Sequence, residues 1–472
     1  MADILLTHAN HLYFDRKQVR KMQPYPPLQT LLAAACLRQA GFEVALFDAT
    51  LEPPEDGFRA ALEKYQPRLA VLCEDNFNFL TKMCLTRNRE LAFFMCQAAR
   101  EAGATVLVNG SDASDHVGDY LAHGADYVLI GEVETTLVEM AAAAAPDGIA
   151  GIAYREGGRV RFHPPRGLIN DLDRLPFPAW DLVDVESYRS RWREAHGYFS
   201  LNMVSSRGCP YRCNWCAKPI YGQSYHCRSP HLVAEEMRYV KSRLAPDRLW
   251  FADDIFALSA RWTVEFAGAV ERMRAQIPFQ MQSRADLMTR DTVSALARAG
   301  CAEVWMGAES GSQKILDAMD KGLRVEQIHR ACERLRAHGI RACLFLQFGY
   351  PGEDWEDIQQ TIRLVREIRP DNIGISVAYP LPGTRFYQLV EAELGPKKNW
   401  EDSDDLAMMF QGAYTSRFYR ELRDALHLEL DVAHGRAPRG AGTRAVRDLW
   451  RRVEELERTC LNPNPTLLWT CC

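Results

Sequence analysis

Three cysteines lie within eight residues near the middle of the chain, in the sequence Cys209-Pro-Tyr-Arg-Cys213-Asn-Trp-Cys216. They directly follow a strand-like run, residues 202–208. A cubane iron–sulfur cluster contains four irons and usually takes four thiolates. Three cysteines on one short loop would leave one iron open to a ligand from outside the protein.

Two other interpretations of these cysteines stay open at the level of the sequence. The last two form a CxxC pair, and His226 and Cys227 follow closely enough to complete a four-ligand zinc site. Structural zinc sites usually combine two matched pairs in a small domain, whereas here the gaps are unequal and a long α/β pattern follows. The cysteines could also be buried, inert thiols. Gly208 and Pro210 beside them favour a ligand loop.

The loop resembles the signature of the radical S-adenosylmethionine (SAM) superfamily, in which an aromatic residue commonly precedes the third cysteine, as Trp215 does here. The resemblance implies a [4Fe-4S] cluster bound by Cys209, Cys213 and Cys216, with SAM chelating the open iron. It also implies that an electron from the cluster cleaves SAM to methionine and a 5′-deoxyadenosyl radical. That electron would come from a donor such as a flavodoxin or ferredoxin.

Length and composition indicate a globular enzyme with more than one domain. The chain has 472 residues, of which 47% are hydrophobic and 25% charged, enough for at least two cores. A formal net charge of −5 gives no electrostatic case for nucleic acid or an anionic membrane as partner.

The C-terminal region is locally basic, and we interpret it as a solvated helix face. Its arginines are Arg436, Arg439, Arg444, Arg447, Arg451 and Arg452.

We expect a cytoplasmic protein without a signal peptide or a membrane span. The first apolar run is short and has an acidic residue at position 3, and no later stretch approaches the length of a transmembrane helix. The terminal Cys471 and Cys472 are interpreted as part of a flexible tail. Five other cysteines fit a reducing compartment as small buried hydrophobes. These are Cys36, Cys73, Cys96, Cys332 and Cys343.

From residue 4 to about residue 145, short apolar runs alternate with amphipathic segments, which predicts a doubly wound parallel sheet. The predicted strands are 4–7, 43–47, 69–73, 105–108 and 127–130. In such sheets, ligands bind outside the carboxyl ends of the strands. Polar segments follow these ends at 8–10, 48–50, 74–76, 109–112 and 131–132. Any one of them could equally form a helix cap or a turn.

Taken in order, these segments resemble the cobalamin-binding half that is fused to one large branch of the superfamily. The resemblance is carried by residues 26–28, 40–48, 109–110 and 125–134. It implies a Rossmann-like domain that binds cobalamin through residues at the ends of the fourth and fifth strands. These are Asn109, Gly110, Gly131 and Glu132.

The chain departs from the cobalamin-binding pattern at two places. The DxHxxG motif, whose histidine takes the place of the base beneath cobalt, is absent, so the cobalt would need another lower ligand, water or none. The family often has two glycines where this chain has Asn109-Gly110, and a Pro-His pair where it has Ser111-Asp112. Polar bulk at these positions could tighten or block the corrin site.

A predicted β-hairpin, residues 151–163, follows the first sheet. The proline-rich segment 175–180 then predicts an extended crossover that is anchored by Phe177 and Trp180. We therefore divide the chain into a cobalamin-binding-like domain, a hairpin and linker, a radical SAM domain and a C-terminal helical region. Their bounds are 1–148, 149–195, 196–388 and 389–472.

Beyond the cysteines, the alternation of strands and helices resumes. The predicted strands are 248–252, 279–283, 302–306, 342–347 and 372–377, and the strand before the cysteines makes six. Six βα units predict a partial TIM barrel whose working face lies at the carboxyl ends of the strands. The expected fold class is thus α/β, with a doubly wound parallel sheet, a (βα)6 partial TIM barrel and a mostly helical C-terminal region.

Polar residues at these strand ends are candidates for contacts with SAM, although each has an ordinary alternative. Asp254 could cap a helix, Arg284 could pair with a neighbouring carboxylate, and Gly349 could belong to a simple turn. The resemblance implies that Asp253 or Asp254 meets the amino group of SAM. It also implies that the Gly349 turn approaches the adenine.

The same resemblance assigns three further contacts with SAM. Ser283 and Arg284 fall where the third strand meets the SAM carboxylate. Glu309, in the sequence Gly-Ala-Glu-Ser-Gly, falls where the family contacts the ribose or the methionine moiety. The sequence assigns no catalytic residue beyond these cofactor contacts.

The most similar subgroup consists of enzymes like the anaerobic magnesium-protoporphyrin IX monomethyl ester cyclase. The resemblance implies hydrogen abstraction from an unactivated carbon, followed by cobalamin-dependent methylation. Two alternatives stay open: radical oxidation or cyclisation without methyl transfer, and a corrinoid- or metal-binding protein without enzymatic activity. The substrate would be a small molecule, such as a tetrapyrrole, a lipid or a natural-product intermediate.

We expect the aromatic residues of the C-terminal region to pack a helical cap rather than line a pocket. These are Trp400, Phe410, Tyr414, Phe418 and Tyr419.

Overall fold

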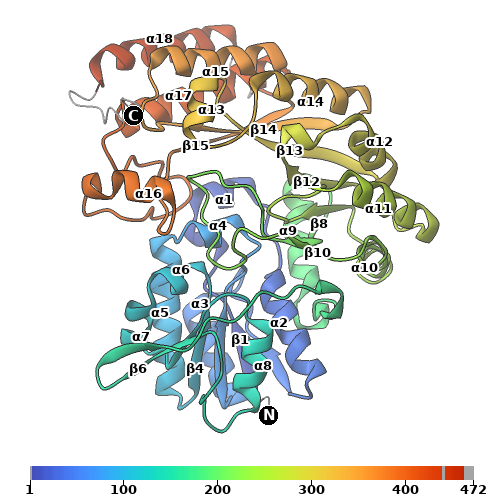
Figure 1. Cartoon of the computed structure of the whole chain (residues 1–472), viewed down its shortest axis with the longest axis vertical. Coiled ribbons are helices and arrows are strands. Elements are labelled where there is room, and N and C mark those ends of the chain that lie inside the picture. The colour runs from blue at the N-terminus through green and yellow to red at the C-terminus, as the bar shows by residue number, and fades with distance from the viewer. Residues whose placement is uncertain (1–2, 438–441, 462–472) are drawn as a thin grey trace.

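The computed structural model of the chain describes residues 3–437 and 442–461. Two sheets are stacked along the long axis of the molecule: the first, in blue and cyan, lies in the lower half of Figure 1, and the second, in green to orange, lies above it. The last helices, in red, lie at the top. The predictions for Arg439, Cys471 and Cys472 fall outside the described residues.

The first sheet has seven strands in the order β2-β1-β3-β4-β5-β6-β7. The strands are β1 (Ile4–Thr7), β2 (Val44–Leu46), β3 (Leu69–Cys73), β4 (Thr105–Asn109), β5 (Tyr127–Leu129), β6 (Ile152–Glu156) and β7 (Arg159–Phe162). β1 to β5 are parallel, as predicted. The hairpin expected in the linker supplies β6 and β7, which add an antiparallel edge because β6 pairs with the free side of β5.

Helices cover both faces of the first sheet, because successive residues of a strand point to opposite faces. Leu5 of β1 belongs to the core under α3, α5 and α7, while Ile4 and Leu6 belong to the core under α2 and α8. The helices are α1 (Arg16–Lys21), α2 (Leu28–Gln39), α3 (Pro54–Tyr65), α4 (Phe79–Lys82), α5 (Thr86–Glu101), α6 (Ser111–Asp115), α7 (Val117–Ala122) and α8 (Glu134–Ala142).

The second sheet has six parallel strands in the order β15-β14-β13-β12-β11-β8, so β8 and β15 are its edges and it does not close into a barrel. The strands are β8 (Ser200–Met203), β11 (Arg248–Phe251), β12 (Phe279–Ser283), β13 (Cys301–Glu309), β14 (Arg341–Phe348) and β15 (Asn372–Val377). This sheet confirms the expected partial barrel.

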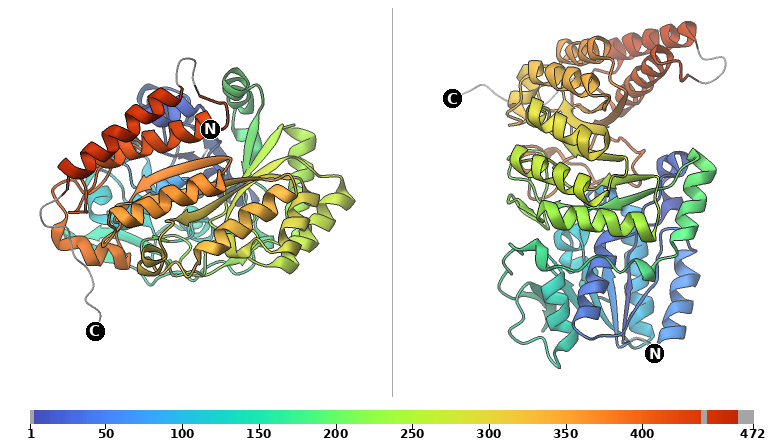
Figure 2. Two further views of the ribbon diagram at one scale, coloured as in Figure 1. Left: turned by 90° about the horizontal axis from the view of Figure 1, so that it is seen from above. Right: turned by 90° about the vertical axis from the view of Figure 1, so that its right-hand side faces the viewer.

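Helices pack against one side of the second sheet (Figure 2), where every second strand residue is buried. They are α10 (Pro230–Arg243), α11 (Ala260–Met273), α12 (Arg290–Ala299), α13 (Gln313–Ala318), α14 (Val325–Ala337) and α15 (Trp355–Ile368). The residues between the buried ones face the other side. Among these, Trp250, Trp305 and Phe345 are partly exposed, and the last two stack with their ring centroids 4.8 Å apart.

The linker contains a helix that the sequence analysis did not predict. It is α9 (Val185–His196), which begins after Asp184, whose carboxylate accepts hydrogen bonds from two of the first backbone N–H groups. Trp192 of α9 is 1% exposed, and its indole donates to the carbonyl of Pro24 at 2.6 Å. Trp180 is buried, as expected of an anchor.

The C-terminal region is mostly helical, as predicted, with α16 (Arg385–Val390), α17 (Ser416–Ala433) and α18 (Thr443–Thr459). The five aromatic residues named in the sequence analysis are all buried, which confirms that they pack a core. Of the six arginines named in the sequence analysis, the five that the structure describes are exposed, as expected of a solvated face. Short 3-10 helices occupy Leu12–Phe14, Leu172–Arg174, Trp180–Leu182, Ala285–Leu287 and Glu391–Glu393. None of the described helices has the length and apolarity needed to cross a membrane.

The run before the cysteines is not one continuous strand. It divides into β8 and the short β9 (Ser206–Arg207), which pairs antiparallel with β10 (His226–Cys227). Asp253, at the end of β11, accepts hydrogen bonds from the backbone N–H and the hydroxyl of Ser205 and from the hydroxyl of Ser206. These bonds hold the bend, so the cysteine loop leaves from a small ribbon at the carboxyl end of the sheet.

Candidate functional site

The cysteine loop has a fixed start and a compact turn. Gly208 has φ +76°, and a Cβ there would lie 2.3 Å from the carbonyl oxygen of Ser224, so only glycine fits. Within the loop, the N–H of Cys216 donates to the carbonyl of Cys213 at 3.2 Å. Cys209 and the other two cysteines are half-buried and form no disulfide. One short segment therefore presents three free thiols beyond the strand ends.

Cationic side chains lie beside these thiols. Burial raises the pKa of Cys209, and it raises the pKa of Cys216 to about 12, while the charge of Lys218 acts in the opposite direction on both. Nη1 of Arg284 donates to Sγ of Cys213 at 3.9 Å. Metal ligation requires thiolates, and neighbouring cations favour that form. The donor set and its surroundings fit an iron–sulfur cluster.

The alternative zinc ligands have a backbone role in this structure. His226 and Cys227 form β10, which pairs with β9 at the base of the cysteine loop. A structural zinc site needs four ligands around one ion. Across residues 3–437 and 442–461, no group of three or more His, Cys, Asp or Glu side chains is arranged to hold one ion. A cubane cluster has several irons and distributes its thiolates among them.

The two aspartates after β11 differ in their surroundings. Asp253 is 1% exposed, and burial raises its pKa to about 6 although three serine groups donate to it. Asp254 is partly exposed and forms an ion pair with Lys82 of α4, in the first half of the chain. Of these two carboxylates, that of Asp254 reaches a residue in the first half of the chain, whereas Asp253 supports the bend before the cysteines.

Arg284 joins the third strand end to the cysteine loop. Its Nε donates to Asp286 Oδ1 at 3.0 Å, and its Nη2 donates to the carbonyl of Lys321 at 2.9 Å. The guanidinium also lies 3.8 Å from the ring centroid of Tyr211. The neighbouring Ser283 donates its hydroxyl to the carbonyl of Phe256 at 2.8 Å. Arg284 thus has both the ordinary carboxylate partner and a position beside the cysteines.

Glu309 forms a buried ion pair that the sequence analysis did not anticipate. Lys321 Nζ lies 2.7 Å from Glu309 Oε1, and the side chains are 7% and 5% exposed. Burial lowers the pKa of Lys321, but the charge of Glu309 outweighs this and the pKa is raised. Glu309 has φ +61°, a left-handed backbone that is strained for glutamate. Gly307 leaves room for the pair, since a Cβ there would lie 2.5 Å from Glu309 Oε1.

The turn after β14 is connected to the cysteine loop. Gly349 has φ +76°, and its N–H donates to Oε2 of Glu353 at 2.6 Å. Burial raises the pKa of Glu353 to about 8, so this carboxyl group is largely neutral at pH 7. The hydroxyl of Tyr350 donates to Oδ1 of Asn214 at 2.8 Å. Because Asn214 lies inside the cysteine loop, the turn and the loop hold each other.

The candidates on the first sheet are mostly engaged within the protein. Asn109 is fully buried, and its Nδ2 donates to the carbonyls of Leu129 and Gly131 at 2.8 and 3.0 Å. Gly110 lies against the side chain of Glu74, where a Cβ would be 2.8 Å from Cγ. Gly131 has φ +80° and open space beside it. Glu132 is buried and accepts from Arg207, as described below.

Several acidic residues lie at the carboxyl-terminal edge of the first sheet. Burial raises the pKa of Glu74 to about 7 and that of Asp75 to about 6. Asp48 accepts from the hydroxyl of Tyr188 at 2.7 Å and lies 3.0 Å from Nε2 of His8. Burial lowers the pKa of His8, but Asp48 and the other acids raise it, and the net shift is upward.

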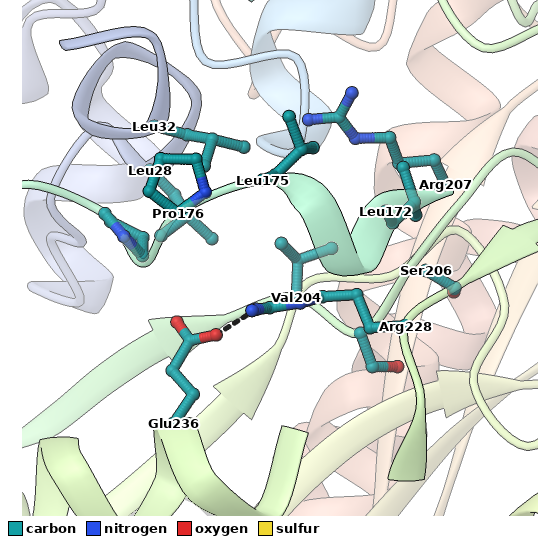
Figure 3. A pocket seen from close by; sticks show the side chains of 12 residues that line it. Leu28, Leu32, Leu172, Leu175, Pro176, Val204, Ser206, Arg207, Arg228 and Glu236 are labelled. Carbon is teal, nitrogen blue, oxygen red and sulfur yellow. Dashed lines mark hydrogen bonds and ion pairs between the residues drawn. The ribbon is translucent and has the colours of Figure 1, made fainter. Parts of the chain in front are cut away.

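A small, narrow pocket lies at the joint between the two halves. Figure 3 shows Leu28 and Leu32 of α2, Leu175 and Pro176 of the linker, and the ion pair of Arg228 with Glu236 around it. None of the three cysteines lines this pocket. Nε and Nη2 of Arg228 have no hydrogen-bond partner among the described residues, and a bound water would satisfy them.

Residues 203–365, from the end of β8 to α15, match the Radical SAM superfamily model. The chain therefore contains a radical SAM domain. The match includes the cysteine loop and the strand ends that carry Asp254, Arg284, Glu309 and Gly349. The assignment confirms the prediction of a radical SAM enzyme.

Curated relatives extend the similarity over both halves of this radical SAM chain. A methyltransferase of Pyrococcus horikoshii is 28% identical over 315 residues, which are 62% of this chain and 68% of that protein. The hopanoid C-3 methylase of Methylococcus capsulatus is 26% identical over 401 residues, 83% of this chain and 73% of that enzyme. The anaerobic magnesium-protoporphyrin IX monomethyl ester cyclase of Rubrivivax gelatinosus is 25% identical over 287 residues, but this match spans only 49% of that enzyme.

Two solved structures share the fold. The radical SAM methyltransferase TsrM of Kitasatospora setae, solved with cobalamin and a [4Fe-4S] cluster, superposes with a TM-score of 0.68 at 20% identity, covering 83% of this chain and 78% of that one. The cobalamin-dependent radical SAM enzyme OxsB, solved with aqua-cobalamin and SAM, gives a TM-score of 0.71 at 17% identity, covering 97% of this chain and 71% of that one. The order of the two sheets is thus a known radical SAM architecture.

Proposed function

We propose that this radical SAM enzyme is a cobalamin-dependent methyltransferase that acts on an unactivated carbon of a small molecule. One observation carries the proposal: the carboxyl-terminal edges of the two sheets face each other. Lys82, which follows β3, pairs with Asp254, which follows β11. Glu132, which follows β5, pairs with Arg207, which precedes the cysteine loop. Ligands of parallel α/β sheets bind at this edge, so two bound cofactors would meet between the sheets.

In this proposal, Cys209, Cys213 and Cys216 hold a [4Fe-4S] cluster. The cluster and SAM would supply a 5′-deoxyadenosyl radical, which removes a hydrogen atom from the substrate. An electron donor such as a flavodoxin or ferredoxin would reduce the cluster. The protein's own part is to hold SAM in one orientation and to keep water away from the reacting carbon.

The candidate residues around the loop have the charges that SAM requires. Arg284 would bind the SAM carboxylate, since its guanidinium already lies beside Cys213. Asp254 would accept from the amino group. The buried pair of Glu309 with Lys321 would face the ribose or the methionine moiety, and Gly349 would approach the adenine through its backbone. Ser283 would position Arg284 rather than touch SAM, because its hydroxyl is bonded to the Phe256 carbonyl.

The first sheet would hold cobalamin, which supplies a transferable methyl group. Gly131 fits this role best, because its left-handed backbone has open space beside it and glycine lets a ligand approach the backbone closely. Asn109 would act indirectly by fixing the ends of β4 and β5. Gly110 would keep the turn close to Glu74, and Glu132 would act through Arg207 rather than on the cofactor.

The inner side of the barrel sheet supports a small, largely apolar substrate. Trp250, Trp305 and Phe345 are partly exposed there, and aromatic faces bind flat apolar groups. A tetrapyrrole, a lipid or a natural-product intermediate could use this surface. Methyl transfer is favoured because several curated relatives are named as methyltransferases, among them the bacteriochlorophyllide d C-12(1)-methyltransferase of Chlorobaculum tepidum.

Radical oxidation or cyclisation without methyl transfer is the second candidate function, because relatives named as anaerobic magnesium-protoporphyrin IX monomethyl ester cyclases are also similar to this chain. The two functions differ in their products. The test is anaerobic reconstitution with iron, sulfide and hydroxocobalamin, followed by metal analysis and incubation with candidate substrates. A methyltransferase yields S-adenosylhomocysteine together with 5′-deoxyadenosine and retains cobalt. An oxidase or cyclase yields 5′-deoxyadenosine alone, and this result would overturn the methyltransferase proposal.

A further inference from the structure

The cysteine loop is tied to the first sheet by the residue just before Gly208. Arg207 lies in β9, two positions before Cys209, and its side chain is 3% exposed. Its Nη1 donates to Oε1 of Glu132 at 2.7 Å, and its Nη2 donates to Oε1 of Glu134. Both carboxylates follow β5 and are as deeply buried as the arginine. The base of the loop is therefore anchored in the other half of the chain.

Further segments hold the two carboxylates in place. Nε2 of Gln29, in α2, donates to Glu134 at 2.9 Å, and the hydroxyl of Tyr221 donates to Oε1 of Gln29 at 2.7 Å. The backbone N–H of Ile169, in the linker, donates to Glu132. Tyr221 follows the last cysteine by a few residues, so the network contacts the loop on both sides. The first sheet, α2 and the linker thus all meet the cysteine loop at this network.

Burial and charge make the network specific for an arginine. The guanidinium of Arg207 lies 5.7 Å from the ring centroid of Phe77 and 5.4 Å from that of Tyr221. Burial alone would raise the pKa of Glu134, but Arg207 lowers it below its ordinary value, so this carboxylate stays charged. Two carboxylates and two aromatic rings surround one planar cation. Lysine cannot make the two-pronged contact.

We propose that Arg207 is a positioning residue for the iron–sulfur cluster, through which the first sheet sets where the loop presents Cys209. The inference rests on the proposed function, since it presumes the cluster. Its mechanical basis is the short distance along the chain: only Gly208 separates the anchored residue from the first cysteine, and that glycine has no room for a side chain. A shift of Arg207 therefore moves Cys209. The first half of the chain would then be needed for SAM cleavage even when no cobalamin takes part.

The test compares Arg207→Met and Arg207→Lys with a matched control, Arg228→Met. Arg228 is also buried, at 7% exposure, and also pairs with a glutamate, but Glu236 lies in the same half of the chain. Each protein is reconstituted anaerobically without cobalamin. The measurements are iron and sulfide content, the electron paramagnetic resonance spectrum of the reduced cluster with and without SAM, and the rate of 5′-deoxyadenosine formation at saturating SAM.

We expect Arg207→Met to alter the change that SAM causes in the spectrum and to lower the cleavage rate at least tenfold. Arg207→Lys restores part of both, and Arg228→Met keeps the wild-type spectrum. A wild-type spectrum and rate in Arg207→Met, or equal effects in Arg207→Met and Arg228→Met, would overturn the inference. If Arg207→Met does not fold, Glu132→Gln, which removes one anchor, takes its place and must show the same spectral change. If the wild-type protein loads the cluster but cleaves no SAM, the proposed function itself fails, and the inference fails with it.

Discussion

The carboxyl-terminal edges of the two sheets follow the same fold rule but differ in the state of their polar side chains. At the barrel edge, three thiols are free and half-buried, and Arg284 and the pair of Glu309 with Lys321 lie beside them. At the first sheet's edge, Asn109 and Glu132 already have protein partners. The thiols of the cysteine loop therefore remain available for a metal cluster, whereas Asn109 and Glu132 would act on a ligand only through other groups of the protein.

This contrast assigns different work to the two halves. At the barrel edge, charged groups dominate: Lys218 lies beside the thiols, and the ion pair of Glu309 with Lys321 is buried nearby. At the edge of the first sheet, Asn109 is hydrogen-bonded to the ends of β4 and β5, and Gly131 has open space beside its backbone. Substitutions at the barrel edge should change SAM chemistry, whereas most substitutions at the first edge should change stability.

The largest effect is expected from Cys213→Ala. Loss of one of three thiolates leaves the cluster without its ligand set, so iron, sulfide and visible cluster absorbance should fall to background. The control is Cys332→Ala, since Cys332 is buried in the barrel core far along the sequence. If Cys213→Ala binds as much iron and sulfide as Cys332→Ala, the cysteine loop at the barrel edge does not hold the cluster.

A smaller effect is expected from Glu309→Gln. Loss of a charged hydrogen-bond partner in the proposed SAM site should raise the KM for SAM by roughly 10- to 100-fold. Glu303→Gln is the control, because Glu303 lies at the opposite end of β13 in an ion pair with Arg341. Steady-state kinetics would measure the KM for SAM of both variants. Equal KM values would show that Glu309 does not contact SAM.

The pH dependence of stability tests the turn beside the cysteine loop. The pKa of Glu353 is raised from 4.5 to about 8, so the folded protein holds this proton more tightly than the unfolded chain. The stability from this group is complete below pH 4.5 and is lost as the pH rises towards 8, at about 1.4 kcal/mol per pH unit. Glu353→Gln removes this loss. Urea unfolding at pH 5 and at pH 8 should show a flatter pH dependence for the variant, and parallel curves would refute the assignment.

The sequence predicted the strands of both sheets, but it did not predict contacts between residues that are distant in the sequence. Apolar runs were sufficient to locate the strands of both parallel sheets along the chain, because most strand residues of the first sheet and about every second strand residue of the barrel sheet are buried. The break between β8 and β9 was missed, because it depends on Asp253, which is distant in sequence. Lys321 was missed as well, since no local pattern distinguishes a buried lysine from a solvated one.

The role of Glu132, at the edge of the first sheet, could not be predicted from the sequence. Its place after β5 was predictable, but its partner Arg207 lies 75 positions away. A sequence pattern therefore could not separate a ligand contact from an anchor between the two halves. α9 was missed although its local signals were present: Asp184 caps its start, Tyr188 and Trp192 lie on one buried face, and Gly197 follows its last residue.

The smallest effect is expected from Asn109→Ala. The loss of its hydrogen bonds leaves buried carbonyls unpaired, which should lower the free energy of unfolding by about 1–3 kcal/mol. SAM cleavage without cobalamin should be unchanged. Chemical denaturation and 5′-deoxyadenosine formation, measured on the same preparation, check both statements. A loss of cleavage without a loss of stability would give Asn109 a direct role.

We expect the carboxyl-terminal edge of the barrel sheet to start the radical chemistry. The most direct test is a single-turnover measurement: the anaerobically reconstituted protein, with iron and sulfide content verified, receives a strong reductant and SAM. We predict 5′-deoxyadenosine and methionine in equal amounts from the wild-type protein and neither from Cys213→Ala. A wild-type protein with an intact, reduced cluster that leaves SAM unchanged would contradict it.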